Sequence, residues 1–247
     1  MDVKIGRIVN VSTLEWPGLS SAVIYFGGCR YRCPFCYEKD ILDPLTCKDY
    51  SVEDVFNQVM EQRQLIEAVT FDGGEATEQE EALIFLAKSF KEEGLKIKLN
   101  TNGENAGAVI KMATQNALDY LSLDIKAPLH RKNHYKKLLG GIDPEKVLTG
   151  IRQIFEVRPA LKFFFECKTT FVPALLHEHD IVKIAQDIGR NCDRYLLQQL
   201  DASRAVVDPS VLEEVSSEEK LKEIAKKCKP YTKEIAIKTI DGVVESL

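Results

Sequence analysis

The sequence lacks long hydrophobic runs and any excess of positive charge. No segment of its 247 residues approaches the roughly 18 consecutive apolar residues that a membrane-spanning helix needs. Its 33 Lys and Arg are outnumbered by 38 Asp and Glu, which gives a net charge of −5 and a pI near 5.6. Because nucleic acids and anionic membranes attract basic surfaces, we expect neither as a partner.

The sequence also lacks the marks of a secreted protein. Its first stretch, MDVKIGRIVNVSTLEWPG, has no apolar core of the kind found in signal peptides. Four of the seven cysteines, Cys47, Cys167, Cys192 and Cys228, are widely scattered, whereas a disulfide framework has closely spaced, even-numbered cysteines. We therefore expect a cytoplasmic protein with reduced thiols.

What the chain does contain is a regular alternation of strand and helix patterns. Its 45% hydrophobic content suits one globular domain over residues 1–247. Strands are expected at residues 4–9, 22–26, 68–71, 96–100, 120–125, 161–171 and 194–200. Helices are expected after a Ser51 cap, after capping boxes at Thr77-x-x-Glu80 and Ser216-x-x-Glu219, at 106–115, after Asp143-Pro144, and around 181–188. About six strand–helix units predict a parallel sheet, either an open partial barrel or a doubly wound sheet.

The most informative stretch is a C-x3-C-x2-C array formed by Cys29, Cys33 and Cys36. It follows the apolar run 22–26, and Gly27-Gly28 breaks that run, so the thiols should lie on a loop at the carboxyl end of a strand. Three close thiols suit a soft metal centre, and iron–sulfur clusters normally use four cysteines. With three ligands, one iron would stay open for a further ligand, as in a catalytic zinc site.

Two other readings of the array are a redox dithiol and a structural zinc site. A dithiol at Cys33 and Cys36 does not explain Cys29, and a structural zinc site needs a second ligand pair that the following residues do not supply. Cys47 follows soon after, but the array is complete without it, so we expect no ligand role for it.

Polar motifs fall at the carboxyl ends of several expected strands. Parallel β/α folds build their sites from these ends, so the motifs and the cysteine loop should converge on one pocket. The candidate ligand-binding residues are Gly73, Gly74, Glu75, Thr101, Asn102, Asp124, Lys126, Lys168 and Gln198. Each motif also has a simpler reading, as a turn, a solvated salt bridge or a surface pair, and it is their shared position that favours a site.

The cysteine array resembles the cluster motif of the radical S-adenosylmethionine (radical SAM) enzymes. The resemblance implies that Cys29, Cys33 and Cys36 hold a [4Fe-4S] cluster and that SAM chelates the fourth iron. It also implies an open partial (β/α)6 barrel of parallel strands, with a cluster loop at 27–37, a core barrel at about 19–200, and a C-terminal helix and tail at 210–247.

The other motifs resemble those of particular families of radical SAM enzymes. Gly73-Gly74-Glu75 matches the motif that binds the SAM amino group, with Ala76 where Pro is often found. Asp124-x-Lys126 resembles the motif of glycyl-radical activating enzymes, in which the lysine meets the SAM carboxylate. The stretch around Lys168 and the pair at Gln198 resemble the activating proteins of anaerobic ribonucleotide reductase, where Arg is expected in place of Lys168.

These resemblances imply an activase that works under anaerobic conditions and needs no catalytic acid or base. A reduced cluster would cleave SAM to a 5′-deoxyadenosyl radical, which would generate a glycyl radical on a partner such as anaerobic ribonucleotide reductase. The expected electron donor is ferredoxin or flavodoxin. The alternatives are a radical SAM enzyme with a small-molecule substrate, resembling 7-carboxy-7-deazaguanine synthase, and a non-catalytic metal or thiol redox module.

Overall fold

The computed structural model describes residues 1–204, 206–242 and 244–247 as alternating strands and helices. The strands are β1 (Asp2–Ser12), β2 (Ser21–Phe26), β3 (Lys48–Ser51), β4 (Ala68–Gly73), β5 (Lys96–Thr101), β6 (Tyr120–Asp124), β7 (Phe164–Phe171), β8 (Arg194–Gln199), β9 (Ile235–Lys238) and β10 (Val244–Ser246). The α-helices are α1 (Val52–Met60), α2 (Glu80–Glu92), α3 (Ala106–Thr114), α4 (Lys132–Leu138), α5 (Glu145–Val157), α6 (Glu178–Ile188) and α7 (Glu218–Cys228).

The chain divides into two compact units, each built from several segments. Unit 1 comprises residues 1–30, 40–122 and 149–164, and unit 2 comprises 31–39, 123–148 and 165–247. Unit 1 carries the strand order β3-β1-β2-β4-β5, followed by the first half of β6. Unit 2 carries the end of β6 and then β7-β8-β9-β10. Of the described residues, none form a helix long and apolar enough to cross a membrane.

The central strands of both units are parallel, as the alternating pattern predicts. β2 pairs with β4 and β4 with β5 in unit 1, and β7 pairs with β8 and β8 with β9 in unit 2. The outer strands are antiparallel: β1 pairs with β2 and β3, and β10 pairs with β9. The predicted α/β fold with parallel strands is confirmed.

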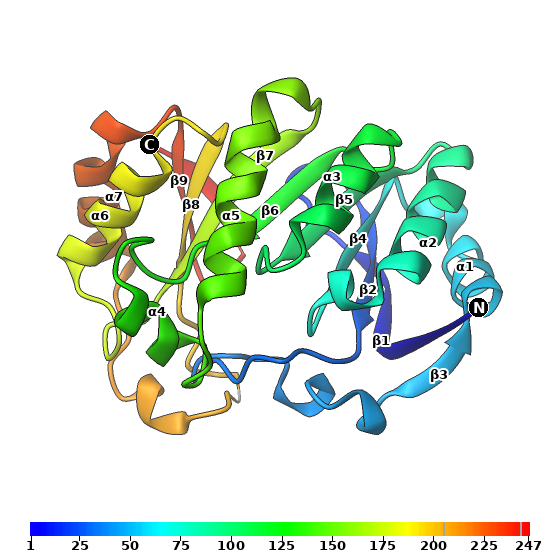
Figure 1. The fold of residues 1–247 in the computed structure, drawn as a ribbon, viewed down its shortest axis with the longest axis horizontal. Helices are drawn as coiled ribbons and strands as arrows, with labels where there is room; N and C mark the ends of the chain where they lie inside the picture. The colour runs from blue at the N-terminus through cyan, green and yellow to red at the C-terminus, as the bar shows by residue number, and fades with distance from the viewer. Residues whose placement is uncertain (205, 243) are drawn as a thin grey trace. The chain divides into compact units, whose positions relative to one another are not determined.

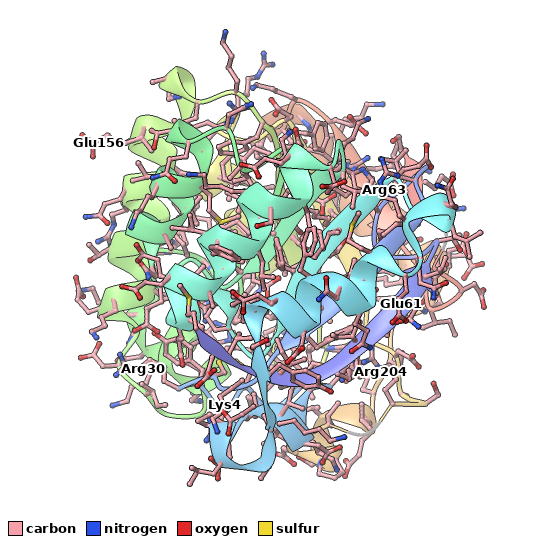
Figure 2. The ribbon with its side chains drawn as sticks, turned by 90° about the vertical axis from the view of Figure 1, so that its right-hand side faces the viewer. Lys4, Arg30, Glu61, Arg63, Glu156 and Arg204 are labelled. Atoms are coloured by element: carbon pink, nitrogen blue, oxygen red, sulfur yellow. The ribbon has the colours of Figure 1, made fainter. Side chains whose placement is uncertain are left out.

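Unit 1 packs its helices on the sheet through aromatic side chains. α1 and α2 lie side by side over one face of the strands (Figures 1 and 2). Phe56 of α1 stacks on Phe90 of α2 with ring centroids 5.2 Å apart, and Phe90 meets Phe71 of β4 at 6.4 Å. Such contacts bury large apolar surfaces, which is the main force holding helix to sheet. Trp16 packs into a second cluster, edge-on to Tyr120 at 5.4 Å.

Several predicted helix signals are confirmed. The Ser51 hydroxyl accepts from Asp54 N at 3.0 Å at the start of α1. Asp143 accepts from Glu145 N at 3.0 Å, just before α5. Gly94 has a φ of +77°, the left-handed conformation that ends many helices, two residues after α2.

Two predicted caps are wrong, and several elements were not predicted. α2 begins at Glu80, and the Thr77 hydroxyl donates to Glu75 instead of capping the helix. α7 is capped by Ser217, whose hydroxyl accepts from Lys220 N, and not by Ser216. The elements that were not predicted are β3, α4, β9 and β10.

Candidate active site

The backbone of the cysteine loop is fixed within unit 1 up to Cys29. Gly27 N donates to Lys4 O at 2.8 Å, Gly28 N to Ile41 O at 2.8 Å, and Cys29 N to Leu42 O at 3.1 Å. Because each of these amides has a partner in β1 or in the segment after the loop, the Cys29 end of the loop starts from a defined position.

Gly73 and Gly74 allow another stretch of backbone to approach this loop. A Cβ on Gly74 would lie 2.0 Å from Gly28 O, and one on Gly73 would lie 2.4 Å from Phe26 N and O. Both positions therefore exclude a side chain. Gly74 N donates to Phe26 O at 2.9 Å, and Glu75 N to Gly28 O at 2.7 Å. The sequence predicts that these glycines let a ligand come close to the backbone. In the structure, they let the backbone of Phe26 and Gly28, which leads to Cys29, come close.

Two residues of the next turn hold the same loop, and the sequence analysis missed both. The side-chain oxygen of Gln79 accepts a hydrogen bond from Lys4 N at 2.8 Å. The side-chain nitrogen of Gln79 donates to Lys4 O at 2.9 Å and to Gly27 O at 3.0 Å. Glu78 accepts from Arg30 N at 3.0 Å. Lys4 and Arg30 lie at the same edge of unit 1 (Figure 2). Both residues lie inside the predicted capping box, and their partners stand 75 and 48 residues away in sequence, so no local pattern marks them.

Glu75 lies at the centre of a buried hydrogen-bond network. Its side chain is 2% exposed, and its Oε1 accepts from the hydroxyls of Thr77 and Thr101, each at 2.6 Å. Its Oε2 accepts from Asn102 N at 2.8 Å. Burial raises the pKa of this carboxyl, and the hydrogen bonds act in the opposite direction. The network joins the turns after β4 and β5, so three predicted residues are brought together.

A buried acceptor on β5, in the residue before Thr101, lacks a hydrogen-bond partner among the described residues. The Asn100 side-chain nitrogen donates to Asp72 Oδ2 at 2.6 Å. Among the described residues, its Oδ1 is buried and has no hydrogen-bond partner. Because such groups are costly to leave unpaired, this oxygen fits a ligand that brings a donor, such as an ammonium or a hydroxyl.

In unit 2, the loop continues through Cys33 and Cys36. Cys36 N donates to Cys33 O at 3.0 Å, and Asp208 N donates to Pro34 O at 2.8 Å. Burial raises the pKa of both thiols, that of Cys36 to about 11. Nearby positive charge from Lys126 lowers the pKa of Cys33 and partly offsets its burial. A bound metal ion would favour the thiolate forms in the same way.

Asp124, Lys126 and Lys168 form a charged cluster in unit 2. Lys126 Nζ lies 2.8 Å from Asp124 Oδ2, and Lys168 Nζ lies 3.2 Å from Asp124 Oδ1. Burial would raise the pKa of Asp124, but the two ammonium groups outweigh it and lower the pKa to about 2. Lys126 also lies 5.7 Å from the ring centroid of Phe35, which sits between Cys33 and Cys36. The predicted motif is therefore adjacent to the cysteine loop.

Two tyrosines that the sequence analysis did not select support this arrangement. The hydroxyl of Tyr135, fully buried on α4, accepts from Lys126 N at 3.2 Å. The Tyr37 hydroxyl accepts from Asp201 N at 2.7 Å, and the Arg204 guanidinium lies 4.2 Å from the Tyr37 ring centroid. Tyr135 belongs to α4, whose sequence shows no clear apolar period, so no local pattern marks this residue.

Gln198 and Cys47, the two other cysteine or polar positions considered in the sequence, lie outside the networks described above. Gln198 is half-buried near the end of β8, in register with Thr170 of β7 and Lys238 of β9. The Cys47 thiol lies 3.7 Å from the carbonyl oxygens of Ile41 and Asp43 in unit 1. A Cβ on Gly27 would overlap Cys47, so Cys47 packs against the loop backbone.

The side chains fit an iron–sulfur cluster by their chemistry. All seven cysteines are reduced thiols, and Lys126 supplies positive charge beside Cys33. Across residues 1–204, 206–242 and 244–247, no three Cys, His, Asp or Glu side chains are already gathered as a metal site. Cys29 belongs to unit 1 and the other two cysteines to unit 2. The ligand set therefore remains a prediction from spacing and donor type.

Comparison with known sequences gives consistent matches. Residues 23–188 match the family described as the Radical SAM superfamily. A Methanocaldococcus jannaschii protein, provisionally named a glycyl-radical enzyme activating enzyme, is 31% identical over 246 residues, which cover 99% of this chain and 100% of that protein. Pyruvate formate-lyase 1-activating enzyme of Escherichia coli K12 is 35% identical over 106 residues, which cover 40% of this chain and 43% of the enzyme.

Comparison with solved structures concerns the fold alone, because the identities are low. TYW1 with a lysine-pyruvate adduct bound has a TM-score of 0.67 at 15% identity, over 88% of this chain and 75% of that chain. Methylornithine synthase (PylB) has a TM-score of 0.61 at 17% identity, over 90% of this chain and 66% of that chain.

Proposed function

The chain belongs to the radical SAM superfamily of enzymes, and we propose that it is an activase that generates a glycyl radical on a partner enzyme. The observation that carries the proposal is the match to a protein named as a glycyl-radical enzyme activating enzyme over the full length of both chains. The predicted α/β fold with parallel strands is consistent with the partial barrel of this superfamily.

The superfamily uses a [4Fe-4S] cluster and SAM. When bound, the reduced cluster supplies the electron that cleaves SAM to methionine and a 5′-deoxyadenosyl radical. In this chain, Cys29, Cys33 and Cys36 would hold the cluster. The contacts of Gly28 with Gly74 and Glu75 fix the start of their loop, and the contact of Pro34 with Asp208 fixes its middle.

The remaining predicted residues would bind and orient SAM. Lys126 would meet the SAM carboxylate, and Asp124 and Tyr135 hold Lys126 in place through its ammonium and its backbone amide. Lys168 would add positive charge beside it. Gly73, Gly74, Glu75, Thr101, Asn102 and Gln198 are the other proposed SAM contacts.

Glu75 contributes through the turns that it organises. Its carboxylate oxygens already accept from Thr77, Thr101 and Asn102, so its side chain fixes the backbone of these turns. Backbone groups of the turns, together with the unpaired Asn100 Oδ1, would then offer acceptors to the ligand. A single buried carboxyl would in this way order two neighbouring parts of the site.

The comparisons favour this function over the alternatives. Several curated relatives are named activating enzymes of glycyl-radical enzymes or of pyruvate formate-lyase, which favours a protein substrate over a small molecule. Membership of an enzyme superfamily disfavours a non-catalytic metal or redox module.

The proposed partners are a glycyl-radical enzyme and an electron donor such as ferredoxin or flavodoxin. We propose no nucleic-acid partner, on the basis of the net charge of −5. We propose a cytoplasmic location, on the basis of scattered cysteines that form no disulfide framework. Anaerobic conditions follow from the oxygen sensitivity of glycyl radicals and remain part of the proposal.

Isotope transfer tests the function. The reconstituted chain would be mixed with SAM, a reductant and a glycyl-radical enzyme labelled with deuterated glycine. Deuterium should appear in 5′-deoxyadenosine, and it should not appear when the radical-site glycine of the partner is replaced by alanine. Turnover of a small metabolite without any protein partner would contradict the proposal.

A further inference from the structure

Two stretches of this acidic chain, residues 127–142 and 224–233, carry positive charge without any Asp or Glu, and the first of them lies beside the cysteine loop. Residues 127–142 contain no Asp or Glu but include four Lys and Arg, in a chain whose net charge is −5. The stretch includes α4 and belongs entirely to unit 2. It therefore forms a local cationic surface on a chain whose net charge is negative.

α4 presents these charges to solvent and anchors itself through apolar side chains. Tyr135 and Leu138 are fully buried, whereas the four cationic side chains are exposed: Arg131, Lys132, Lys136 and Lys137. Helical spacing places the buried and exposed residues on different sides of this short helix. The charges can thus be changed without touching the contacts that hold the helix.

Some of these cations already have carboxylate partners, and two do not. Arg131 pairs with the buried Asp180, and Lys132 Nζ lies 2.5 Å from Glu145 Oε2. Among the described residues, neither Lys136 nor Lys137 has an ion-pair partner. These two adjacent lysines are the uncompensated charges of the surface.

A cavity lies beside the same helix. It has a volume of about 820 Å³ and is lined by side chains of α4 and of the segment before α6, including Lys137, His134 and His177. The single carboxylate in its wall is Asp180, which Arg131 already neutralises. An acidic side chain from a partner would meet positive and imidazole groups here.

The helix is joined directly to the cysteine loop. Arg32 N donates to Leu139 O at 3.3 Å, and a Cβ on Gly140 would lie 2.3 Å from Arg32 O. On the buried side of α4, the Tyr135 hydroxyl accepts a hydrogen bond from the backbone amide of Lys126. Figure 1 shows α4 beside residues 31–39, the part of the blue segment that belongs to unit 2. A protein bound on α4 would therefore lie next to Cys33 and its neighbours.

We propose that Lys136 and Lys137, with the adjoining cavity, form the docking surface for an acidic one-electron carrier protein. The inference rests on the proposed function, which consumes one electron for each SAM cleaved. In each transfer, the carrier is oxidised by one electron and [4Fe-4S]2+ is reduced to [4Fe-4S]+. Because this chain and an acidic carrier are both negative overall, productive encounter requires a local cationic surface near the cluster.

The test compares two double charge-reversal variants of the full, cluster-loaded chain. K136E/K137E alters the docking surface, and K88E/K226E alters exposed lysines of α2 and α7, which likewise have no ion-pair partner among the described residues. Both variants move the formal net charge from −5 to −9, so a general charge effect would appear equally in both. The probe is a reduced acidic flavodoxin, and cluster reduction is followed by absorbance in a stopped-flow instrument without any partner enzyme.

At low ionic strength, K136E/K137E should slow cluster reduction by flavodoxin by about tenfold or more and weaken its salt dependence, while K88E/K226E stays within about twofold of the parent. Reduction by dithionite should remain similar in all three proteins. Equal rates with flavodoxin, or equal slowing in both variants, would overturn the docking surface. Dithionite-driven SAM cleavage would still report on the proposed function separately.

Discussion

Gly74 lies against Gly28 so closely that a Cβ on Gly74 would stand 2.0 Å from the Gly28 carbonyl oxygen. The two glycines belong to segments 46 residues apart in sequence, and Glu75 N donates to the same carbonyl at 2.7 Å. Since Cys29 follows Gly28 directly, this contact links the turn after β4 to the start of the cysteine loop.

Replacing Gly74 with alanine should therefore disturb the cluster loop. The new methyl group would force two backbone segments apart, and overpacking of this kind costs about 1–3 kcal/mol or more. We expect a lower urea midpoint and less iron bound per chain. Gly107→Ala is the matched control, because its Cβ would meet only Asn105 Oδ1, at 3.3 Å. Equal iron content in the G74A variant and the parent would contradict the link.

The three cysteines of the array should differ from Cys47 in iron binding. Replacing Cys29, Cys33 or Cys36 with alanine removes one proposed ligand, so each variant should lose most of its iron and sulfide after anaerobic reconstitution. Cys47→Ala should keep both, because the Cys47 thiol packs against the carbonyl oxygens of Ile41 and Asp43 and against the Gly27 backbone. Iron loss in C47A, with retention in any of the other three, would show that the ligand set is wrong.

Removing the Lys126 ammonium should weaken SAM binding while leaving the cluster in place. A charge-assisted hydrogen bond contributes about 1.5–3 kcal/mol, so Lys126→Met should lower SAM affinity by about tenfold or more. Equilibrium binding to the reconstituted protein would measure this loss. Lys88→Met, on the exposed face of α2, should bind SAM like the parent. If K126M bound SAM normally, Lys126 would not meet its carboxylate.

Glu75→Gln should destabilise unit 1. The carboxylate accepts from Thr77, Thr101 and Asn102 through both oxygens, and an amide would turn one acceptor into a donor that faces these donors. Leaving buried donors unpaired costs about 1–3 kcal/mol each, so the free energy of unfolding should fall by at least that amount. Urea unfolding of the variant and the parent would measure it, and unchanged stability would argue against a structural role.

The sequence predicted most of the alternating fold because its signals were local. Ser51 stands directly before an apolar helical period, so the start of α1 can be read from the sequence. Thr77 failed as a cap because a tertiary partner, Glu75, takes its hydroxyl. β9 was missed because residues 235–238 are too short a run to show a period, and α4 because its charged residues outnumber its apolar ones.

The sequence indicates which residue types form the candidate site, but not which contacts assemble it. The alternation of Asp124 and Lys126 at a strand end predicts that both side chains face one pocket, and the structure shows that they form an ion pair at 2.8 Å. Nothing in Gly73-Gly74 reveals that the nearest backbone is that of Gly28, since the two segments are far apart in sequence. The role of Gln79 could not be predicted for the same reason, because its hydrogen-bond partner Lys4 lies 75 residues away in sequence.

Electron paramagnetic resonance of the dithionite-reduced, anaerobically reconstituted protein, recorded with and without SAM, tests the central claim most directly. Three cysteine ligands leave one iron for SAM, so a [4Fe-4S]+ signal should be present and should change when SAM is added. A zinc-loaded protein without that signal, or a cluster signal that SAM leaves unchanged, would contradict the account.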